Sequence, residues 1–391
     1  MPTQISTKVS RYPLENFDQP VTLDNWQQTP YSRWGFSHVN ELVTTAAILR
    51  SRHPRPWLHR DLALTSYQAW QEVEDFLEET HTDGFAVLHR GEIVYERYTA
   101  MGLHDRHVLM SVSKSICALV IGILVGKGLI DPEQPVREYV PALAGAGYGD
   151  ATVRHVLDMT ASVRYSENYA DPDSEVRQQD RIAGWASPRH DDPADNYEFL
   201  ASLDAAGQHG QAFLYCSAGT DVLAWVAENV TGLRYADIIA TELWSRLGTE
   251  DDAFITTDRS GFAFANGGIG CTTRDLLRVG ALLLDGGRAG GRQVVPQDWI
   301  EDILRGGDPI LARGSAYQQA HPQGSYRSQF WVPGDDRGTV YAVGIHGQFV
   351  WVDPPSRTVI VKFSSCPDAT SVAHNLRHAA GFRRVIELLD N

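Results

Sequence analysis

A serine and a lysine three residues apart stand where a long apolar run begins. Ser111 and Lys114 lie directly before the apolar residues 116–125. At this spacing on a helix, both side chains share one face, so the lysine amine can reach the serine hydroxyl. A serine hydroxyl becomes a good nucleophile when a neighbouring base takes its proton. Burial lowers the pKa of a lysine, which lets its neutral amine act as that base.

Lysine is rare in this chain, which gives Lys114 more weight than an accidental Ser-x-x-Lys match would have. Only four of the 34 basic residues are lysines, and we expect Lys8, Lys127 and Lys362 at the surface. Arginine does not lose its proton in proteins, whereas a desolvated lysine does. We therefore predict a serine nucleophile with a lysine base, and first-turn N–H groups that stabilise an oxyanion.

A Ser–Lys pair needs a third group that carries the proton to the leaving atom. Two Tyr-x-Ser motifs offer a tyrosine, at Tyr215-Cys-Ser217 and at Tyr326-Arg-Ser328. The first precedes an apolar, helix-like run and is expected in an inner wall. The second follows a glycine and is expected in an exposed turn, so we choose Tyr215. An edge N–H of the late strand that contains Gly344 can complete an oxyanion hole with the N–H of Ser111.

The elements that must position these residues follow from hydrophobic periodicity and turn signals. Helices are expected at 67–77, 111–125, 273–284, 297–304 and 371–389, and strands at 84–88, 93–98, 329–332, 340–345, 349–352 and 358–363. The polar stretch 166–195, within a helical and loop-rich segment, is a candidate functional loop.

Strands near both ends of the chain, with helices between them, predict two lobes. We expect an α/β lobe from residues 1–135 and 265–391, with an irregular arm over 1–60. An α-rich lobe at 136–264 is inserted into it. The cleft between two lobes is the usual place for a site.

Composition excludes several classes of protein. Of the 391 residues, 43% are apolar, which is enough to build a folded core. The net charge of −15 disfavours nucleic acid as a partner. The longest apolar run is too short for a bilayer, which needs about 20 residues, so no membrane partner is expected. Four scattered cysteines fit a reducing cytoplasm, and the lack of metal and phosphate motifs predicts no cofactor.

The order of these motifs resembles the serine β-lactamase and penicillin-recognising superfamily, in its class C-like branch with esterases and amidases. Within that branch the chain is most similar to the 6-aminohexanoate-dimer (nylon oligomer) hydrolases. The matching segments are Leu109–Ser115, Asn168–Pro172 through Asp180, Tyr215–Ser217, Gly261–Gly268 and Gly344–Gln348. The likeness extends from about residue 20 to the end of the chain.

This resemblance implies a class C β-lactamase-like α/β fold, in which helices flank a mostly antiparallel sheet as a three-layer lobe. It also implies a homodimer. For the catalytic groups it implies Ser111 as nucleophile, Lys114 as base, Tyr215 as proton shuttle, and the N–H groups of Ser111 and Ile345 as oxyanion donors. For substrate binding it implies Tyr169 on a closing loop at the scissile amide, Asp180 near a substrate ammonium, and Asn266, Trp331 and Gly344 in the pocket.

One departure from the superfamily affects specificity. Where penicillin-recognising enzymes have a Lys- or His-bearing K-T-G-like motif, this chain has Ala342-Val343-Gly344. The missing cation argues against carboxylate recognition and β-lactam turnover. The predicted function is a serine hydrolase of linear amides that carry an ammonium group, such as the 6-aminohexanoate dimer. The alternatives are a carboxylesterase of short acyl esters and a penicillin-binding-like protein that is acylated without turnover.

Overall fold

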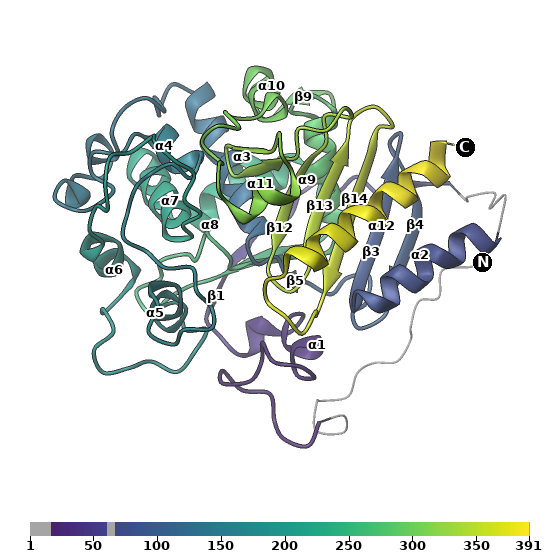
Figure 1. Ribbon diagram of the computed structural model, residues 1–391, viewed down its shortest axis with the longest axis horizontal. Helices are drawn as coiled ribbons and strands as arrows, with labels where there is room; N and C mark the ends of the chain where they lie inside the picture. The colour runs from purple at the N-terminus through teal and green to yellow at the C-terminus, as the bar shows by residue number, and fades with distance from the viewer. Residues whose placement is uncertain (1–16, 61–66, 391) are drawn as a thin grey trace.

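A mostly antiparallel sheet between layers of helices forms the largest part of the protein, as Figure 1 shows for the computed structural model. The structure describes residues 17–60 and 67–390. The sheet has the order β10-β11-β12-β13-β14-β3-β4-β2, and its β2–β4 pair is parallel. Its strands are β2 (Leu58–His59), β3 (Thr82–His89), β4 (Glu92–Tyr98), β10 (Ser325–Arg327), β11 (Phe330–Val332), β12 (Val340–Gly344), β13 (Gln348–Asp353) and β14 (Thr358–Ser364).

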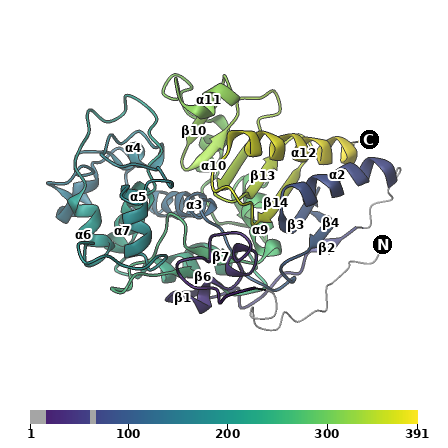
Figure 2. The same ribbon diagram turned by 60° about the horizontal axis from the view of Figure 1, so that its bottom comes forward.

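Helices cover both faces of this sheet, which gives the predicted three layers. Helices α2 (Tyr67–Glu79) and α12 (Val372–Asp390) pack on one face, and α9 (Thr273–Leu284) packs on the other (Figure 2). Successive residues of a strand point to opposite faces. On β3, Val87 therefore joins the core under α12, whereas Ala86 and Leu88 join the core on the opposite face. Burial on both faces explains why the central strands are continuous apolar runs.

A strand from the early part of the sequence pairs with a strand from the late part in the middle of the sheet. Strand β3 pairs with β14, so that Val87 lies opposite Ile360. The long segment between these strands supplies the helices at the other side of the molecule (Figure 1). They are α4 (Val153–Leu157), α5 (Glu175–Ile182), α6 (Asn196–Ser202), α7 (Ala218–Thr231) and α8 (Tyr235–Ile238). The exact lobe limits at 135/136 and 264/265 stay a prediction.

Helix α3 (Val112–Gly126) connects the sheet with the helical part of the chain. All of its residues from Val112 to Leu124 are buried. It contacts α7 on one side and the strands β12 and β13 on the other. A helix that is apolar all around must be covered on every side, and α3 is covered in this way. Its start, where Ser111 is the N-cap residue, is therefore held in a fixed position.

A second, four-stranded sheet was not anticipated from the sequence. Its order is β1-β6-β7-β5, with β1 (Thr45–Ile48), β5 (His107–Val108), β6 (Ala253–Thr256) and β7 (Ile269–Cys271). These strands have two to four residues, too few for a visible alternation of apolar and polar side chains. β6 is also buried at every position. Strand β1 shows that the expected irregular arm contributes to regular structure.

The predicted helices and longer strands lie within a few residues of those observed, and three differences matter. Helix α5 was missed in the polar stretch 166–195, because only Val176 and Ile182 supply its apolar residues. The expectation of an exposed turn at Tyr326 is wrong, since this residue is buried on β10. Its ring packs edge-on against Trp331.

The expectation that Lys362 is a surface residue is also wrong. This lysine is fully buried on β14, where its Nζ donates to the Thr80 carbonyl, at 3.0 Å, and to the Ser364 hydroxyl. These acceptors make burial of the amine tolerable. Lys127 is partly exposed and pairs with Glu242, and Lys8 lies outside the described residues.

No helix in residues 17–60 and 67–390 is long and apolar enough to cross a membrane. Within the same residues, no group of three or more His, Cys, Asp or Glu side chains is arranged to hold a metal ion.

We expect Gly122→Ala to destabilise the protein, although alanine is the better helix former by about 1 kcal/mol. A Cβ at Gly122 would lie 2.5 Å from the indole of Trp299, which is itself buried. Overpacking a core costs about 1 to 3 kcal/mol, which exceeds the gain in helix propensity. Thermal unfolding should give a lower Tm than wild type. Gly145→Ala is the control, because a Cβ there meets nothing within 4 Å; an unchanged Tm for Gly122→Ala would contradict the packing argument.

Candidate active site

Ser111 is held in a tight turn between the small sheet and helix α3. The preceding residue, Met110, has a φ of +50°, a conformation that non-glycine residues rarely adopt. Gly344, at the end of β12, packs directly against this turn. A Cβ on Gly344 would lie 2.6 Å from the Leu109 carbonyl oxygen and 3.0 Å from the Ser111 nitrogen. The absence of a side chain at Gly344 is therefore what lets β12 approach the nucleophile candidate.

Lys114 lies one turn along the helix and points back to Ser111, as the spacing predicts. Its Nζ is 2.9 Å from the Ser111 Oγ and donates to the Asn266 carbonyl at 2.7 Å. The side chain is 1% exposed. This burial lowers the pKa of Lys114 to about 8, while the charges of Glu167 and Asp221 oppose the shift. A substantial fraction of neutral amine is thus present near pH 8, next to the serine hydroxyl.

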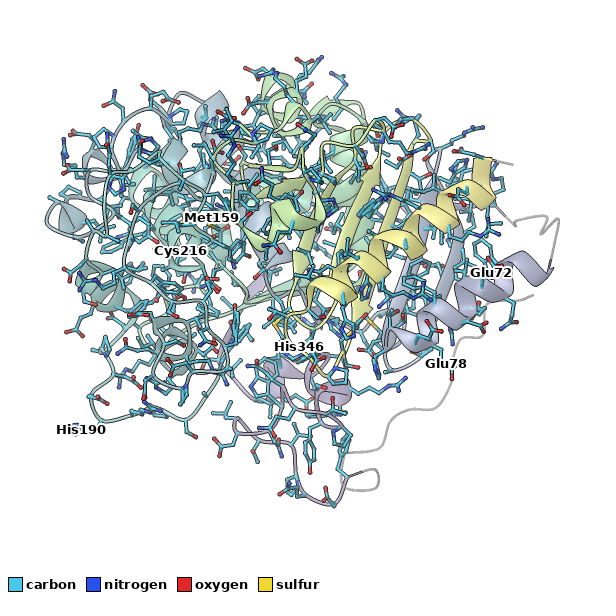
Figure 3. All side chains as sticks on the ribbon, in the orientation of Figure 1. Glu72, Glu78, Met159, His190, Cys216 and His346 are labelled. Carbon is cyan, nitrogen blue, oxygen red and sulfur yellow. The ribbon has the colours of Figure 1, made fainter. Side chains whose placement is uncertain are left out.

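Tyr215 is placed by the residue that follows it. The Cys216 N–H donates to the Met159 thioether at 3.3 Å, and Figure 3 shows these two residues near each other. The Cys216 thiol is 3.0 Å from the Tyr148 hydroxyl. Met159 itself has a positive φ, of +55°. These contacts fix the segment that leads from Tyr215 into α7. Tyr215, the tyrosine chosen from the two Tyr-x-Ser motifs, lies at the same site as Ser111.

The surroundings of Tyr215 keep its phenol protonated at neutral pH. Burial raises its pKa, and the charge of Glu167 adds to this effect, whereas a hydrogen bond with Ser111 opposes it. Its ring centroid is 5.4 Å from the Lys114 Nζ, and the ring stacks on Trp331 at 5.7 Å. Tyr215 is thus in contact with both Ser111 and Lys114, and it carries a proton that it can donate.

The two backbone N–H groups predicted to bind an oxyanion belong to residues that line the pocket. Ser111 and Ile345 both line the main pocket. In the described part of the chain, neither N–H takes part in a turn or loop hydrogen bond with a carbonyl. β12 is an interior strand, between β11 and β13, so the N–H of Ile345 is available because it follows the strand's end and not because the strand is an edge. Free N–H pairs of this kind stabilise developing negative charge.

The pocket has a volume of about 240 Å³, and several separate parts of the chain line it. Its lining residues include Ser111, Tyr215, the end of β12 and Trp331 of β11. Tyr169 and Glu167 come from the polar loop. Residues of the segment 366–378 also line the pocket, among them Asp368 and His374, and the sequence did not indicate this segment as part of the site.

Glu167 is the most important residue that sequence reasoning missed. Its Oε1 accepts a hydrogen bond from the Ser217 N–H, and the carboxylate lies close enough to the Tyr169 hydroxyl to interact with it. Burial raises the pKa of Glu167, and the nearby Lys114 ammonium opposes the shift. The sequence feature that could have indicated Glu167 as a site residue is its position two residues before Tyr169, in the loop predicted to be functional.

Asp180 and Asn266 are close to the pocket, but neither is among its lining residues in the described chain. Asp180 is 6% exposed on α5 and accepts from the Arg177 guanidinium at 2.9 Å. Burial raises the pKa of Asp180 to about 6, whereas Arg177 opposes this. The Asn266 side chain donates to Asp221, so its contact with the site is the carbonyl that binds Lys114. Of the predicted binding residues, Tyr169, Trp331 and Gly344 do line the pocket.

Known proteins with similar sequences and structures include two that are named as 6-aminohexanoate-dimer hydrolases. The chain is 50% identical over 364 residues to the 6-aminohexanoate-dimer hydrolase of Paenarthrobacter ureafaciens, which covers 92% of this chain and 91% of the relative. It is 30% identical to the esterase EstB of Burkholderia gladioli, over 45% of this chain and 48% of the esterase. A Bacillus anthracis structure, assigned as a candidate 6-aminohexanoate-dimer hydrolase, superposes with a TM-score of 0.86 at 28% identity, over 95% and 97% of the two chains.

The family model named Beta-lactamase matches residues 71–382, from α2 to α12. This range contains the whole eight-stranded sheet except β2, the helical segment and every candidate residue of the site. The resemblance inferred from the motifs, and the class C-like fold that it implied, are confirmed. The chain belongs to the Beta-lactamase family.

Proposed function

We propose that this protein is a serine hydrolase of linear amides, with the 6-aminohexanoate linear dimer as the best-matched substrate. The observation that carries the proposal is the buried Lys114 amine, held between the Ser111 hydroxyl and the Asn266 carbonyl. The 50% identical relative is named for this substrate. Both support a catalytic Ser–Lys pair within an amidase branch of the family.

The proposed reaction begins with the neutral form of Lys114. One N–H of the amine donates to the Asn266 carbonyl, which turns the lone pair toward Ser111. The lone pair takes the serine proton as Oγ attacks the amide carbon. The oxyanion that forms receives hydrogen bonds from the N–H groups of Ser111 and Ile345.

The amide nitrogen must then be protonated, because an amine anion is a very poor leaving group. In our proposal Tyr215 donates this proton and recovers one from Lys114. The C–N bond breaks, the amine leaves, and the acyl group stays on Ser111 as an ester. Water then attacks the acyl carbon and gives a proton to Lys114, which passes it to the Ser111 Oγ as the ester C–O bond breaks and the acid leaves.

The charges around the pocket favour a substrate with a positive end. Two carboxylates, Glu167 and Asp180, lie beside Tyr169, and the Arg177 guanidinium already donates to Asp180 at 2.9 Å, so Glu167 is the one left for a cation. Strand β12 has no basic side chain, so it offers nothing to a carboxylate. An amide with an ammonium at one end fits this distribution, and a penicillin-like carboxylate does not.

An esterase remains the second candidate, because esters react at the same site and EstB is a relative. A penicillin-binding-like protein that is acylated without turnover is the third. A burst followed by a steady rate on p-nitrophenyl acetate would separate turnover from trapping.

We further propose a cytoplasmic homodimer. All four cysteines, which lie in the described residues, are buried and unpaired, as expected in a reducing compartment. The proposal of a homodimer rests on the family resemblance. Size-exclusion chromatography with light scattering tests it by measuring the molar mass in solution.

The first test concerns the nucleophile. Ser111→Ala should abolish turnover, by at least a thousandfold, because the group that forms the acyl-enzyme is gone. Intact-mass spectrometry with a slow ester should find one acyl group on wild type and none on the variant. Ser113→Ala is the control, since the Ser113 hydroxyl accepts from the Ile269 N–H and is buried away from the pocket. An adduct that maps to Ser113 or Ser217 would contradict the assignment.

The second test concerns the base. If neutral Lys114 accepts the proton, kcat/KM for p-nitrophenyl acetate should rise with pH through about 8, the lowered pKa of this lysine. Lys114→Arg keeps the charge but cannot deprotonate, so it should be as inactive as Lys114→Ala. The control is Lys127→Arg, the same change at a partly exposed site. More than a tenth of wild-type activity in Lys114→Arg would rule out the base role.

The third test separates amidase from general esterase function. Tyr169→Phe and Asp180→Asn should each lower hydrolysis of the linear dimer at least tenfold. Tyr169→Phe removes the hydrogen bond to the scissile amide, and Asp180→Asn removes a charged hydrogen bond to the ammonium, which contributes about 1.5 to 3 kcal/mol. p-Nitrophenyl acetate lacks both the amide N–H and the ammonium, so its rate should change less than about threefold. Asp173→Asn removes the same charge from an exposed position in the same loop and serves as control. Equal losses on both substrates would refute amide selectivity by these residues.

A further inference from the structure

Asp221 is a buried carboxylate that the proposed reaction does not use. It lies in the first turn of α7 and is fully buried. Its Oδ1 accepts the Asn266 backbone N–H at 2.9 Å. Its Oδ2 accepts three side-chain amides: Gln179 at 2.8 Å, Asn196 at 2.9 Å and Asn266 at 2.9 Å. Asp221 thus accepts four hydrogen bonds, one on Oδ1 and three on Oδ2.

The donors to Asp221 come from separate parts of the chain. Gln179 is on α5, directly before Asp180, and Asn196 is the first residue of α6. Asn266 stands in the turn before β7, and its carbonyl accepts from the Lys114 Nζ at 2.7 Å. A continuous chain of hydrogen bonds therefore leads from α5 through Asp221 and Asn266 to Lys114.

We propose that Asp221 is a positioning residue, which holds the Asn266 carbonyl against Lys114 and ties it to the helix that carries Asp180. The proposal rests on the proposed function of Lys114 as the base. It explains why Asn266 belongs to the site although its side chain points to Asp221. It also links the base to the α5 carboxylate considered for substrate binding.

The direction of the lone pair on Lys114 depends on this arrangement. A neutral amine has two N–H donors and one lone pair, so fixing one donor on a carbonyl limits where the lone pair points. Asn266 is fixed through both its backbone and its side chain by one carboxylate. In Asp221→Asn, the NH2 group of the new amide would face the N–H donors that now bind the carboxylate. These donors would lose their acceptor, and the turn that contains Asn266 would move.

Asp221 also acts on Lys114 through its charge. The ionisable groups that face Lys114 are Glu167, Asp221, Cys216 and Asp180, and the ring of Tyr215 packs against it. A negative charge nearby favours the ammonium form. Burial raises the pKa of Asp221 itself to about 7, so this carboxylate is mostly charged at the pH where Lys114 titrates. Loss of the Asp221 charge should therefore lower the pKa of Lys114 and bring the neutral amine to lower pH.

The test is the pH profile of Asp221→Asn, measured as kcat/KM for p-nitrophenyl acetate and for the linear dimer. We expect the rise in kcat/KM to move to lower pH by about 0.5 to 1 unit. The plateau kcat should fall about tenfold or more, because the Asn266 carbonyl no longer fixes the amine. KM for p-nitrophenyl acetate should change by less than about threefold, since Asp221 does not line the pocket.

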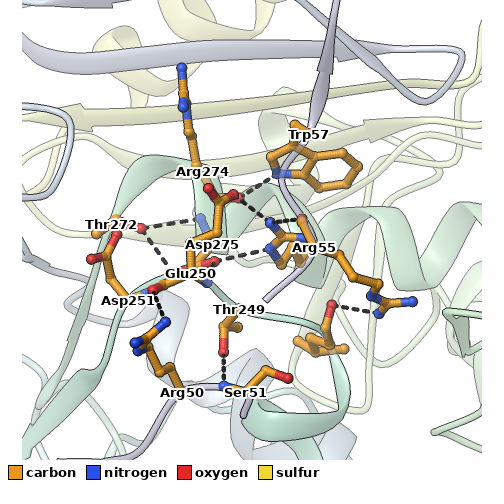
Figure 4. A network of polar contacts seen from close by, with 12 residues as sticks. Arg50, Ser51, Arg55, Trp57, Thr249, Glu250, Asp251, Thr272, Arg274 and Asp275 are labelled. Carbon is orange, nitrogen blue, oxygen red and sulfur yellow. Dashed lines mark hydrogen bonds and ion pairs between the residues drawn. The ribbon is translucent and has the colours of Figure 1, made fainter. Parts of the chain in front are cut away.

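Asp275→Asn is the matched control. Asp275 is an equally buried carboxylate on α9, which accepts the backbone N–H groups of Glu250 and Asp251 and pairs with Arg278 (Figure 4). None of the residues in this network lines the pocket. Asp275→Asn should lower Tm, because it breaks a buried network, and should leave the midpoint of the pH profile unchanged.

The outcomes are distinct. An unshifted midpoint in Asp221→Asn, with a fall in Tm like that of Asp275→Asn, would overturn the inference and make Asp221 purely structural. An active Lys114→Arg would overturn the proposed function and this inference with it. If Asp221→Asn does not fold, Asn196→Leu removes one donor from the carboxylate and weakens its ionisation. The same shift to lower pH, but smaller, is then expected, and its absence counts against the inference.

Discussion

The structure of the site depends on one constraint, the burial of the Lys114 amine. An ammonium loses its hydration in a dry interior, which moves the equilibrium toward the neutral base. Helix α3 supplies this interior because it is buried along nearly its whole length. The same helix begins at Ser111, so the core that stabilises the fold also sets the protonation of the base. Stability and proposed reactivity thus have a common origin in the burial of helix α3.

The two sides of the pocket contribute different chemistry. The sheet side supplies backbone groups: the end of β12 carries the Ile345 N–H, and Gly344 lets it approach Ser111 to within contact. The helical side supplies Glu167, and a second acidic residue at the pocket, Asp368, comes from the segment after β14. The proposed oxyanion donors and the Glu167 carboxylate thus come from separate parts of the chain. This separation favours a substrate whose amide carbonyl faces the sheet and whose positive end faces the loop.

How much the sequence reveals depends on how local the signal is. The Ser111–Lys114 pair could be predicted because both residues lie on one turn of one helix. The roles of Glu167 and Asp221 could not, since each depends on partners 40 or more residues away, such as Ser217 and Asn266. The longer strands were predictable from their apolar runs, whereas β1, β5, β6 and β7 are too short to leave a period. Their pairing is set by tertiary contacts.

The second buried lysine shows why burial alone does not identify a base. Lys362 is as buried as Lys114, and desolvation lowers the pKa of each to about 8. Both are also bonded to one serine hydroxyl and one carbonyl. The difference lies in the serine: Ser364 is fully buried, whereas Ser111 opens into the pocket beside Tyr215. A Ser–Lys pair is able to react only where a substrate carbonyl can reach the hydroxyl, so access to the pocket, and not the pKa of the amine, distinguishes the proposed base from the structural lysine.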